Sequence, residues 1–363
     1  MGTVRADVVG SLLRPPALQA ARLARARGEL AADGLAQAED RAVDEAVALQ
    51  EEAGLDAVTD GEYRRDNFYS LVFDAVEGFE PLSPADSADI ELSWRGGTGR
   101  AQAPSRAVCT GRLRRRRPLA ADAFAYLKGR VRRAVPKVTL PAPSFLARYW
   151  SPRLSAHAYA TRDAYLADVV AVLRQEVADL VAAGARYIQF DAPNYALLVD
   201  PDSRARFGDP ERLVPAWAEA DNAVLQGFSD VTFGLHMCRG NNAGMWAAAG
   251  GYEPVAEAFG RLRHERLLLE YDDERSGTFA PLAHVPDDKV VVLGLVSTKA
   301  PEVEDPSRVE ARVREATAYV PLERLAVSPQ CGFASVAAGN PVAWEAQAAK
   351  LAVVGEVAKR LWP

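Results

Sequence analysis

Four side chains in the second half of the chain have the chemistry to bind one metal ion. His236 and Cys238 lie in TFGLHMCRGN. Glu270 ends the apolar run RLLLE, and Cys331 lies just past the apolar run LAVSP. Two sulfurs, a nitrogen and an oxygen suit zinc, whereas magnesium and calcium prefer oxygen ligands alone. The wide spacing fits no compact zinc finger, so we predict a zinc site assembled from separate structural units.

Each of these residues also has a purely structural interpretation. A histidine or cysteine after a strand can simply pack in a core as a small, largely apolar group. The chain has only three Cys and four His, and all the candidate ligands follow or end apolar runs, which favours a shared metal. Asp272 and Asp273 are alternative carboxylates, but Glu270 closes the apolar run. Cys109 is expected to pack internally. The other histidines are expected at the surface: His157, His264 and His284.

The ligand set itself indicates a reaction class. Two thiolates and a carboxylate outweigh the charge of the dication, which makes the site a poor activator of water. Zinc lowers the pKa of a bound thiol, and the resulting thiolate attacks soft carbon electrophiles at neutral pH. The four residues therefore predict alkylation of a thiol substrate.

The bulk composition is that of a globular enzyme. The chain has 363 residues, 49% of them hydrophobic and 25% charged, which allows one large domain with a sizeable core. The formal net charge of −6 argues against general nucleic-acid binding. The sequence shows neither a signal peptide nor an apolar run of about twenty residues. Three cysteines are not a disulfide framework, so we expect a reduced, cytoplasmic setting.

Eight short apolar runs alternate with amphipathic segments. The predicted strands are 6–11, 56–62, 137–144, 187–193, 232–238, 266–272, 289–296 and 324–332. Continuous apolar runs are typical of parallel strands buried on both faces, and this alternation predicts an α/β fold, a TIM (β/α)8 barrel. The alternative is an open doubly wound sheet, but VGSLLRPP after the first run lacks a glycine-rich phosphate loop. Only a barrel would bring all these strand ends to one mouth.

Helical periodicity fills the segments between the strands. The clearest examples are 38–54, 162–185, 210–228, 306–320 and 340–362, with a helix start predicted at Thr161. From about 73 to 118 the alternation breaks, and ELSW and RAVCTG predict a β-hairpin insertion between the second and third barrel strands. We therefore predict a single catalytic domain, 1–363, with one insertion.

Six motifs resemble the cobalamin-independent methionine synthase family, specifically its catalytic carboxy-terminal barrel. They are VVGSLLRP, DGEYRRDNFY, YIQFDAPNY, LHMC, LLLEYDD and SPQCGF, in the family's order over nearly the whole chain. The resemblance implies that zinc, held by His, Cys, Glu and Cys, activates the sulfur of homocysteine for methyl transfer. It also implies that Ser11, Glu62 and Asp191 bind the amino-acid part of the thiol, with Glu62 and Asp191 catalytic. Two acids and a hydroxyl suit an ammonium group.

The chain departs from the family pattern in three ways. It has no second, amino-terminal barrel, so it resembles the short, core-only members. Val296 stands where the family's IHSPN segment has its histidine, and Asp191-Ala192-Pro193 stands where the family has DEP. The methyl donor is therefore open between methyltetrahydrofolate and a methylcorrinoid, the latter with a corrinoid protein partner. The alternatives are an epoxide-opening thiol transferase, a C–S lyase of the same zinc family, or a non-catalytic zinc or thiol-binding protein.

Several further residues are candidates for contacting a substrate or a donor. The basic run Arg112–Arg117 is either a solvated surface or a grip on an anionic donor. Trp150 is expected either to pack in the core or to stack on a flat heterocycle. Arg14, Arg64 and Arg65 are candidates for contacting a substrate carboxylate or sulfonate.

Overall fold

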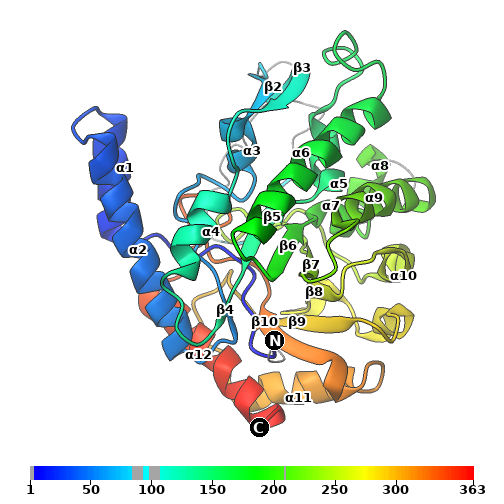
Figure 1. The fold of residues 1–363 in the computed structure, drawn as a ribbon. Helices are drawn as coiled ribbons and strands as arrows, with labels where there is room; N and C mark the ends of the chain where they lie inside the picture. Colours follow the sequence, from blue (N-terminus) through cyan, green and yellow to red (C-terminus); the bar gives the residue numbers. More distant parts are fainter. Residues whose placement is uncertain (1–3, 84–92, 98–106, 208–209) are drawn as a thin grey trace.

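The computed structural model describes residues 4–83, 93–97, 107–207 and 210–363, and a sheet of six parallel strands lies at its centre (Figure 1). The strands follow the order β10-β9-β8-β7-β6-β5. Their bounds are β5 Val138–Pro141, β6 Tyr187–Asp191, β7 Thr232–Met237, β8 Arg266–Glu270, β9 Val290–Val296 and β10 Leu325–Pro329. Almost all of their residues are buried, as expected for parallel strands covered on both faces. The last six predicted strands are confirmed.

Main-chain hydrogen bonds continue from both edges of this sheet into the amino-terminal segment. At one edge, the Asp7 N–H donates to a carbonyl of β10 (2.9 Å). The Asp56 N–H in turn donates to the Ala6 carbonyl (2.8 Å). Beyond it, β1 (Ala57–Val58) pairs in parallel with β4 (Val135–Pro136), which directly precedes β5. The two edges of the six-stranded sheet are thus connected through the first residues of the chain and β1.

The first two predicted strands are much shorter than expected. The segment 6–11 contributes a single bridge at Ala6, and 56–62 contributes only β1. Positive φ values at Gly61 (66°) and Glu62 (61°) end the extended backbone of the second segment. At the start of the first segment, Asp56 Oδ2 accepts the main-chain N–H groups of Arg5 (2.7 Å) and Ala6 (2.8 Å). A side chain that satisfies main-chain donors holds the segment extended without a full ladder.

Helices cover the outside of the sheet, and a hairpin formed by α1 and the start of α2 projects from it (Figure 1). The helices are α1 Pro16–Ala26, α2 Ala32–Glu52, α3 Ser70–Ala75, α4 Ala121–Lys128, α5 Pro143–Leu146, α6 Arg162–Ala182, α7 Pro193–Leu197, α8 Pro201–Phe207, α9 Pro210–Leu225, α10 Glu257–Arg261, α11 Pro306–Ala316 and α12 Trp344–Leu361. The Thr161 hydroxyl caps α6 by accepting the Ala164 N–H (3.1 Å), as predicted. Val169, Leu173 and Val177 form its buried stripe. The five predicted helices are confirmed as α2, α6, α9, α11 and α12.

An antiparallel pair of strands, β2 (Val76–Pro81) and β3 (Ala107–Arg115), lies within the predicted insertion. β3 contains most of RAVCTG, but its partner is VEGFEP rather than ELSW, whose first two residues lie outside the described part of the chain. Gly78, with a φ of 104°, and a register shift beside it interrupt the alternation of β2. This interruption explains why the sequence pattern did not indicate a strand there.

The basic run 112–117 binds acidic side chains of neighbouring elements. Arg115 pairs with Glu176 (2.5 Å) and Asp179 (2.6 Å) of α6. The buried Glu176 carboxylate also accepts three main-chain N–H groups just before and at the start of α4. Two further arginines of the run pair with Glu77 on β2. The Arg115 pairs fasten β3 to α6, the Glu77 pairs join the run to β2, and both support a structural interpretation of the run.

The histidines and the cysteine outside the proposed zinc site differ in burial. The surface prediction for His264 is wrong: the side chain is fully buried, with its ring 6.0 Å from that of Phe190. Burial lowers the pKa of His264 to about 3, so the ring stays neutral. The charged residues around His264 in RLRHER had indicated a surface position. His157 and His284 are exposed and Cys109 is buried, as expected.

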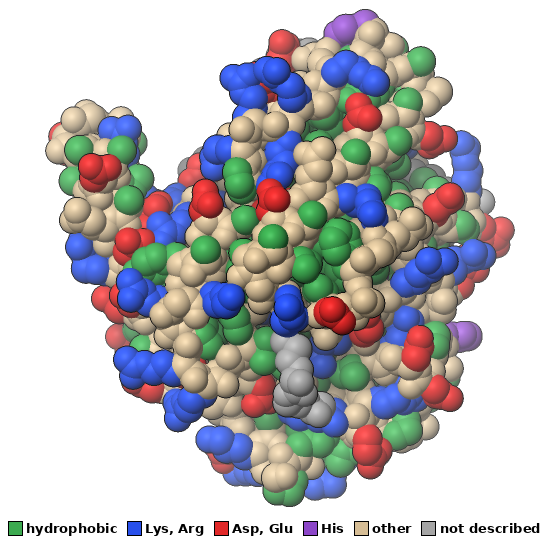
Figure 2. All heavy atoms as spheres, viewed as in Figure 1, with side chains coloured by type: hydrophobic (Ala, Val, Ile, Leu, Met, Phe, Trp, Pro, Cys, Tyr) green, Lys and Arg blue, Asp and Glu red, His purple; other side chains and the backbone are tan. Residues whose placement is uncertain are grey.

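The described surface is mixed in charge. Figure 2 shows Lys and Arg side chains interspersed with Asp and Glu over one face of the molecule. Among the helices that the structure describes, none is both long enough and apolar enough to cross a lipid bilayer.

We expect Glu176→Ala to lower the free energy of unfolding by about 3 kcal/mol, because it removes the buried partner of Arg115 and leaves three main-chain N–H groups without their acceptor. Asp179→Ala is the matched control, since its half-exposed carboxylate binds the same guanidinium and should contribute less than about 1 kcal/mol. Urea unfolding measures both values. Equal losses would show that the buried carboxylate has no special role.

Candidate metal centre

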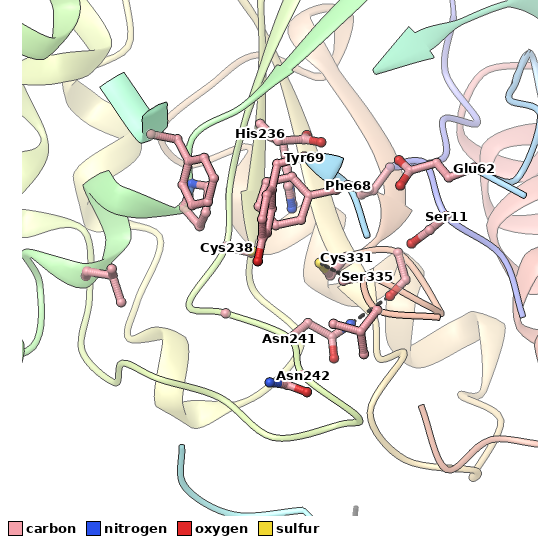
Figure 3. Close-up of a pocket in the computed structure, with 18 of the residues that line it drawn as sticks. Ser11, Glu62, Phe68, Tyr69, His236, Cys238, Asn241, Asn242, Cys331 and Ser335 are labelled. Atoms are coloured by element: carbon pink, nitrogen blue, oxygen red, sulfur yellow. Dashed lines mark hydrogen bonds between the residues drawn. The ribbon is translucent and has the colours of Figure 1, made fainter. Parts of the chain in front are cut away.

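Three of the four predicted ligands meet at the carboxyl ends of β7 and β10 (Figure 3). His236 lies within β7 and Cys238 directly follows it, so the two side chains point to the same side. Cys331 lies just past β10. One imidazole nitrogen and the two sulfurs lie within 4.8 Å of one another, and all three side chains are buried. Such a soft, compact donor set fits zinc.

His236 is oriented for a ligand. Its Nδ1 lies 3.2 Å from the Leu268 carbonyl on β8, which places a proton on Nδ1 and leaves the lone pair on Nε2. Nε2 is buried and has no hydrogen-bond partner among the described residues. A buried nitrogen without a partner is costly unless a ligand satisfies it. This orphaned nitrogen, beside two thiols, fits a bound zinc ion.

The pKa values of the two cysteine thiols are shifted in opposite directions. The hydrogen bond from the Cys238 thiol, together with the adjacent His236 imidazole, holds the pKa of Cys331 well below its usual range despite burial. The same hydrogen bond raises the pKa of Cys238. The lowered pKa favours a thiolate at Cys331, and a negative charge there attracts a cation.

Glu270, the fourth predicted ligand, has different partners. Its Oε1 accepts hydrogen bonds from Arg275 (2.8 Å) and Lys299 (3.1 Å), and its Oε2 accepts the Arg239 N–H (2.5 Å). Burial opposes its ionisation, but Lys299 and Arg275 hold the pKa of Glu270 well below its usual range. Among the described residues, the group of ligand atoms within 4.8 Å of one another does not include Glu270, so its role as a ligand stays a prediction.

The alternative carboxylates have structural roles beside Glu270. Asp272 lies 3.5 Å from Arg275, and Asp273 accepts the Arg275 N–H (3.0 Å) at the start of a short helical turn. Lys299 and Arg275 were not anticipated from the sequence. The only signal for them was their place in polar turns shortly after β9 and β8, where side chains can reach the carboxyl ends of the strands.

The predicted substrate residues line the same pocket as the three ligands. Ser11, Glu62 and Asp191 contribute to a cavity of about 90 Å³. Figure 3 shows Ser11 and Glu62 on one side of Cys331, with Asn241 and Asn242 below it. Four aromatic side chains also line it: Phe68, Tyr69, Trp94 and Phe145. The structure thus brings Ser11, Glu62 and Asp191 together with three of the four predicted ligands around one pocket.

Glu62 is held in a strained position. Its φ is 61°, which costs a non-glycine residue roughly 1–3 kcal/mol and is found mainly at functional sites. Its Oε1 accepts the Thr139 hydroxyl (2.8 Å). A Cβ on Gly10 would lie 2.5 Å from that Oε1, so a side chain at position 10 would displace the carboxylate. The backbone therefore places Glu62 at the pocket against its local preference.

The three candidate arginines bind groups of the protein, and none of them lines the pocket. Buried Arg14 donates to the carbonyls of Glu62 (3.2 Å) and Arg65 (2.5 Å). Arg65 in turn donates to the Thr139 hydroxyl (3.1 Å), and Arg64 pairs with Asp40. These contacts favour a positioning role for all three arginines over direct contact with a substrate.

Asp191 ends β6 and lies opposite His236 in the strand register. Its Oδ1 accepts the Gln189 side-chain N–H (2.7 Å). Burial raises the pKa of Asp191 to about 7, with His236 opposing the rise and Glu62 adding to it. A carboxyl that titrates near neutrality in a pocket is typical of a functional acid or base.

Asn241, Asn242 and Ser335 were missed by the sequence reasoning, although all three line the pocket. Asn241 Nδ2 donates to the Gly332 carbonyl (2.7 Å), which ties the loop after Cys238 to the loop after Cys331. The only sequence signal was the polar turn RGNNAG directly after Cys238. Asn241 therefore helps to set the separation of the two sulfurs.

We expect Asp191→Asn to change how the stability of the metal-free protein depends on pH. The pKa of Asp191 is raised from 3.8 to about 7 in the fold, so the folded chain keeps a proton that the unfolded chain has lost. The free energy of unfolding should fall as the pH rises from about 4 to about 7, and the substitution should remove this part of the slope. Urea unfolding across that range measures it, with exposed Asp179→Asn as control. Parallel curves for wild type and Asp191→Asn would contradict the raised pKa.

Comparison with known proteins agrees with this geometry. Residues 4–360 match the family model described as the catalytic domain of cobalamin-independent synthase. The chain is 37% identical to the uncharacterized protein YxjH of Bacillus subtilis, over 99% of this chain and 94% of that one. It is 27% identical to a methionine synthase of Thermococcus kodakarensis, over 90% and 86%. A solved Listeria monocytogenes structure, described as a candidate vitamin-B12 independent methionine synthase, matches with a TM-score of 0.76 and 29% identity, over 99% and 98%. The chain therefore belongs to the cobalamin-independent synthase family, whose catalytic domain it spans.

Proposed function

We propose that this chain is a zinc-dependent transferase that moves a methyl group, or a related alkyl group, onto the sulfur of a thiol, with homocysteine as the favoured acceptor. The observation that carries the proposal is the buried group of His236, Cys238 and Cys331 in a pocket that Glu62 and Asp191 also line. Membership of a family that includes methionine synthases supports the same reaction class.

Different residues of the pocket would bind the sulfur and the amino group of the acceptor. His236 Nε2 and the two cysteine sulfurs would hold zinc, which when bound lowers the pKa of a substrate thiol. Glu62 and Asp191 would bind the ammonium group of the acceptor. The ammonium charge would keep Asp191 ionised, because a nearby cation stabilises a carboxylate. Two fixed attachment points orient the sulfur toward the donor.

We also propose that the strands close into a (β/α)8 barrel. The main-chain hydrogen bonds of Asp7 and Asp56, together with the β1–β4 pair, support this closure. A closed barrel gathers strand ends at one mouth, where enzymes of this fold place their sites. The positions of Ser11, Glu62, Asp191 and the metal-binding trio around one pocket agree with that arrangement.

We expect Cys331→Ser to lose zinc and thiol alkylation together, since it removes the side chain that carries the thiolate. Cys109→Ser is the matched control, because Cys109 is equally buried but lies on β3, away from the pocket. Metal analysis measures zinc content, and mass spectrometry follows homocysteine and other thiols paired with methyltetrahydrofolate, methylcobalamin and epoxides. Full activity in Cys331→Ser would rule out the proposal, and turnover with epoxides alone would select the epoxide-opening alternative.

The fourth ligand is testable in the same way. We expect Glu270→Gln to weaken zinc binding at least about tenfold, because an ionised carboxylate is replaced by a neutral amide. Competition with a chromophoric chelator gives the dissociation constant. Asp273→Asn, three residues along, is the control, since its carboxylate is half exposed and binds Arg275. Unchanged zinc affinity in Glu270→Gln would confine Glu270 to its ion pairs with Lys299 and Arg275.

A further inference from the structure

Arg239 is among the largest side chains that are fully buried in the described part of the chain. It directly follows the predicted ligand Cys238 in the loop after β7. Within the described residues, every hydrogen bond that its guanidinium donates is accepted by a main-chain carbonyl. Burying a positive charge costs free energy even when carbonyls accept its protons. This cost indicates a role beyond filling space in the core.

The guanidinium of Arg239 joins three segments beside the candidate metal centre. Its Nε and Nη2 donate to the Gly250 carbonyl (2.9 and 2.7 Å), which closes the loop that follows β7. Its Nη1 donates to the Glu270 carbonyl at the end of β8 (3.1 Å), and Nη2 also donates to the Ser276 carbonyl in the turn beyond it (3.1 Å). A planar group with several fixed donors can hold three segments in this way, whereas the compact ammonium of a lysine cannot.

Tyr252 lies against Arg239 and joins the ends of two strands. The guanidinium carbon of Arg239 lies 4.2 Å from the centroid of the Tyr252 ring, which is also fully buried. The Tyr252 hydroxyl donates to the carbonyl of Met237, the last residue of β7 (2.7 Å). The same hydroxyl accepts the N–H of Glu270, the last residue of β8 (3.1 Å). One hydroxyl therefore bridges the carboxyl ends of both strands.

These contacts begin where the pairing of the two strands stops. The register of β7 with β8 ends at Met237 and Leu269, so the strand ladder no longer holds Cys238 against Glu270. Beyond that point, Tyr252 binds the N–H of Glu270 and Arg239 binds its carbonyl. The main-chain N–H of Arg239 also donates to Glu270 Oε2 (2.5 Å). Cys238 thus lies between two residues whose main-chain groups are both tied to the end of β8.

We propose that Arg239 and Tyr252 are positioning residues of the metal centre, which hold Cys238 and Glu270 at a set separation beyond the end of the strand ladder. The inference rests on the proposed function, in which Cys238 is a zinc ligand. Ligands that are already held in place lose little conformational freedom when a metal ion binds. Residues that orient the ligands therefore raise the affinity for the metal, although they do not touch it.

Cobalt(II) is the probe for this inference, because its visible absorption bands depend on the type and geometry of its ligands. We expect the full chain to bind Co²⁺ through thiolate ligands, and Tyr252→Phe to weaken this binding at least about tenfold and to shift the bands. This substitution keeps the ring beside Arg239 and removes only the hydroxyl that bridges the strand ends. Arg239→Lys should weaken Co²⁺ binding by at least as much, since it keeps the charge and loses the planar fork. Titration followed by absorption measures both affinity and spectrum.

Tyr165→Phe is the matched control, because it removes a chemically equivalent hydroxyl away from the metal centre. Tyr165 is fully buried on α6, and its hydroxyl donates to the Leu146 carbonyl (3.0 Å). Both substitutions leave a buried carbonyl without its donor, so both should lower the urea midpoint of unfolding. Only Tyr252→Phe should change the absorption bands, and Tyr165→Phe should leave the Co²⁺ affinity within about twofold of the wild type.

The outcomes separate this inference from the proposed function. Wild-type affinity and bands in Tyr252→Phe, or equal weakening of Co²⁺ binding by Tyr252→Phe and Tyr165→Phe, would overturn the inference. Tyr252→Phe decides the matter even where Arg239→Lys fails to fold. A wild type that binds Co²⁺ but alkylates no thiol would contradict only the proposed function, whereas a wild type that binds no Co²⁺ would overturn both.

Discussion

The register of the parallel strands is the constraint on which the site depends. Asp191 on β6 lies opposite His236 on β7, and Glu270 on β8 lies opposite Gly294 on β9. Because side chains alternate along a strand, a slip of one residue would turn His236 and Cys238 away from the pocket. The strands are buried on both faces, so such a slip would also displace close-packed Leu, Val and Phe side chains. The apolar core therefore sets the geometry of the polar site.

A buried polar network also fixes the orientation of Asp191, an acid that lines the pocket. Lys137, fully buried beneath the site, donates to Asp7 (2.8 Å) and to Gln189 Oε1 (2.8 Å). Since the Gln189 oxygen accepts from a cation, its amide N–H must point the other way, toward Asp191 Oδ1 (2.7 Å). The orientation of Asp191 thus follows from an ion pair in the interior. Buried polar chains of this kind hold their members in one arrangement.

Much of the fold follows from local sequence patterns, whereas long-range polar contacts do not. The six strands of the sheet are predictable because short apolar runs between helices have few other arrangements. His236 and Cys331 could be grouped because parallel strands end at one edge. Asp56, by contrast, binds the main-chain N–H groups of Arg5 and Ala6 through side-chain hydrogen bonds that no periodicity indicates. Lys299 reaches Glu270 from a different loop, and no spacing rule relates residues whose contact depends on how loops fold over the ends of the strands.

The cations around Glu270 change the electrostatic environment that a metal ion and a substrate would meet in the pocket. Lys299 and Arg275 place two positive charges beside the pocket, which would repel a dication unless the ligands carry an excess of negative charge. Under the proposed function, two thiolates with a carboxylate would supply that excess, which a set of neutral ligands would not. A thiolate acceptor would add one more negative charge, and the same two cations would offset it in a buried site. The ion pairs of Glu270 would then favour binding the proposed acceptor in its deprotonated, reactive form.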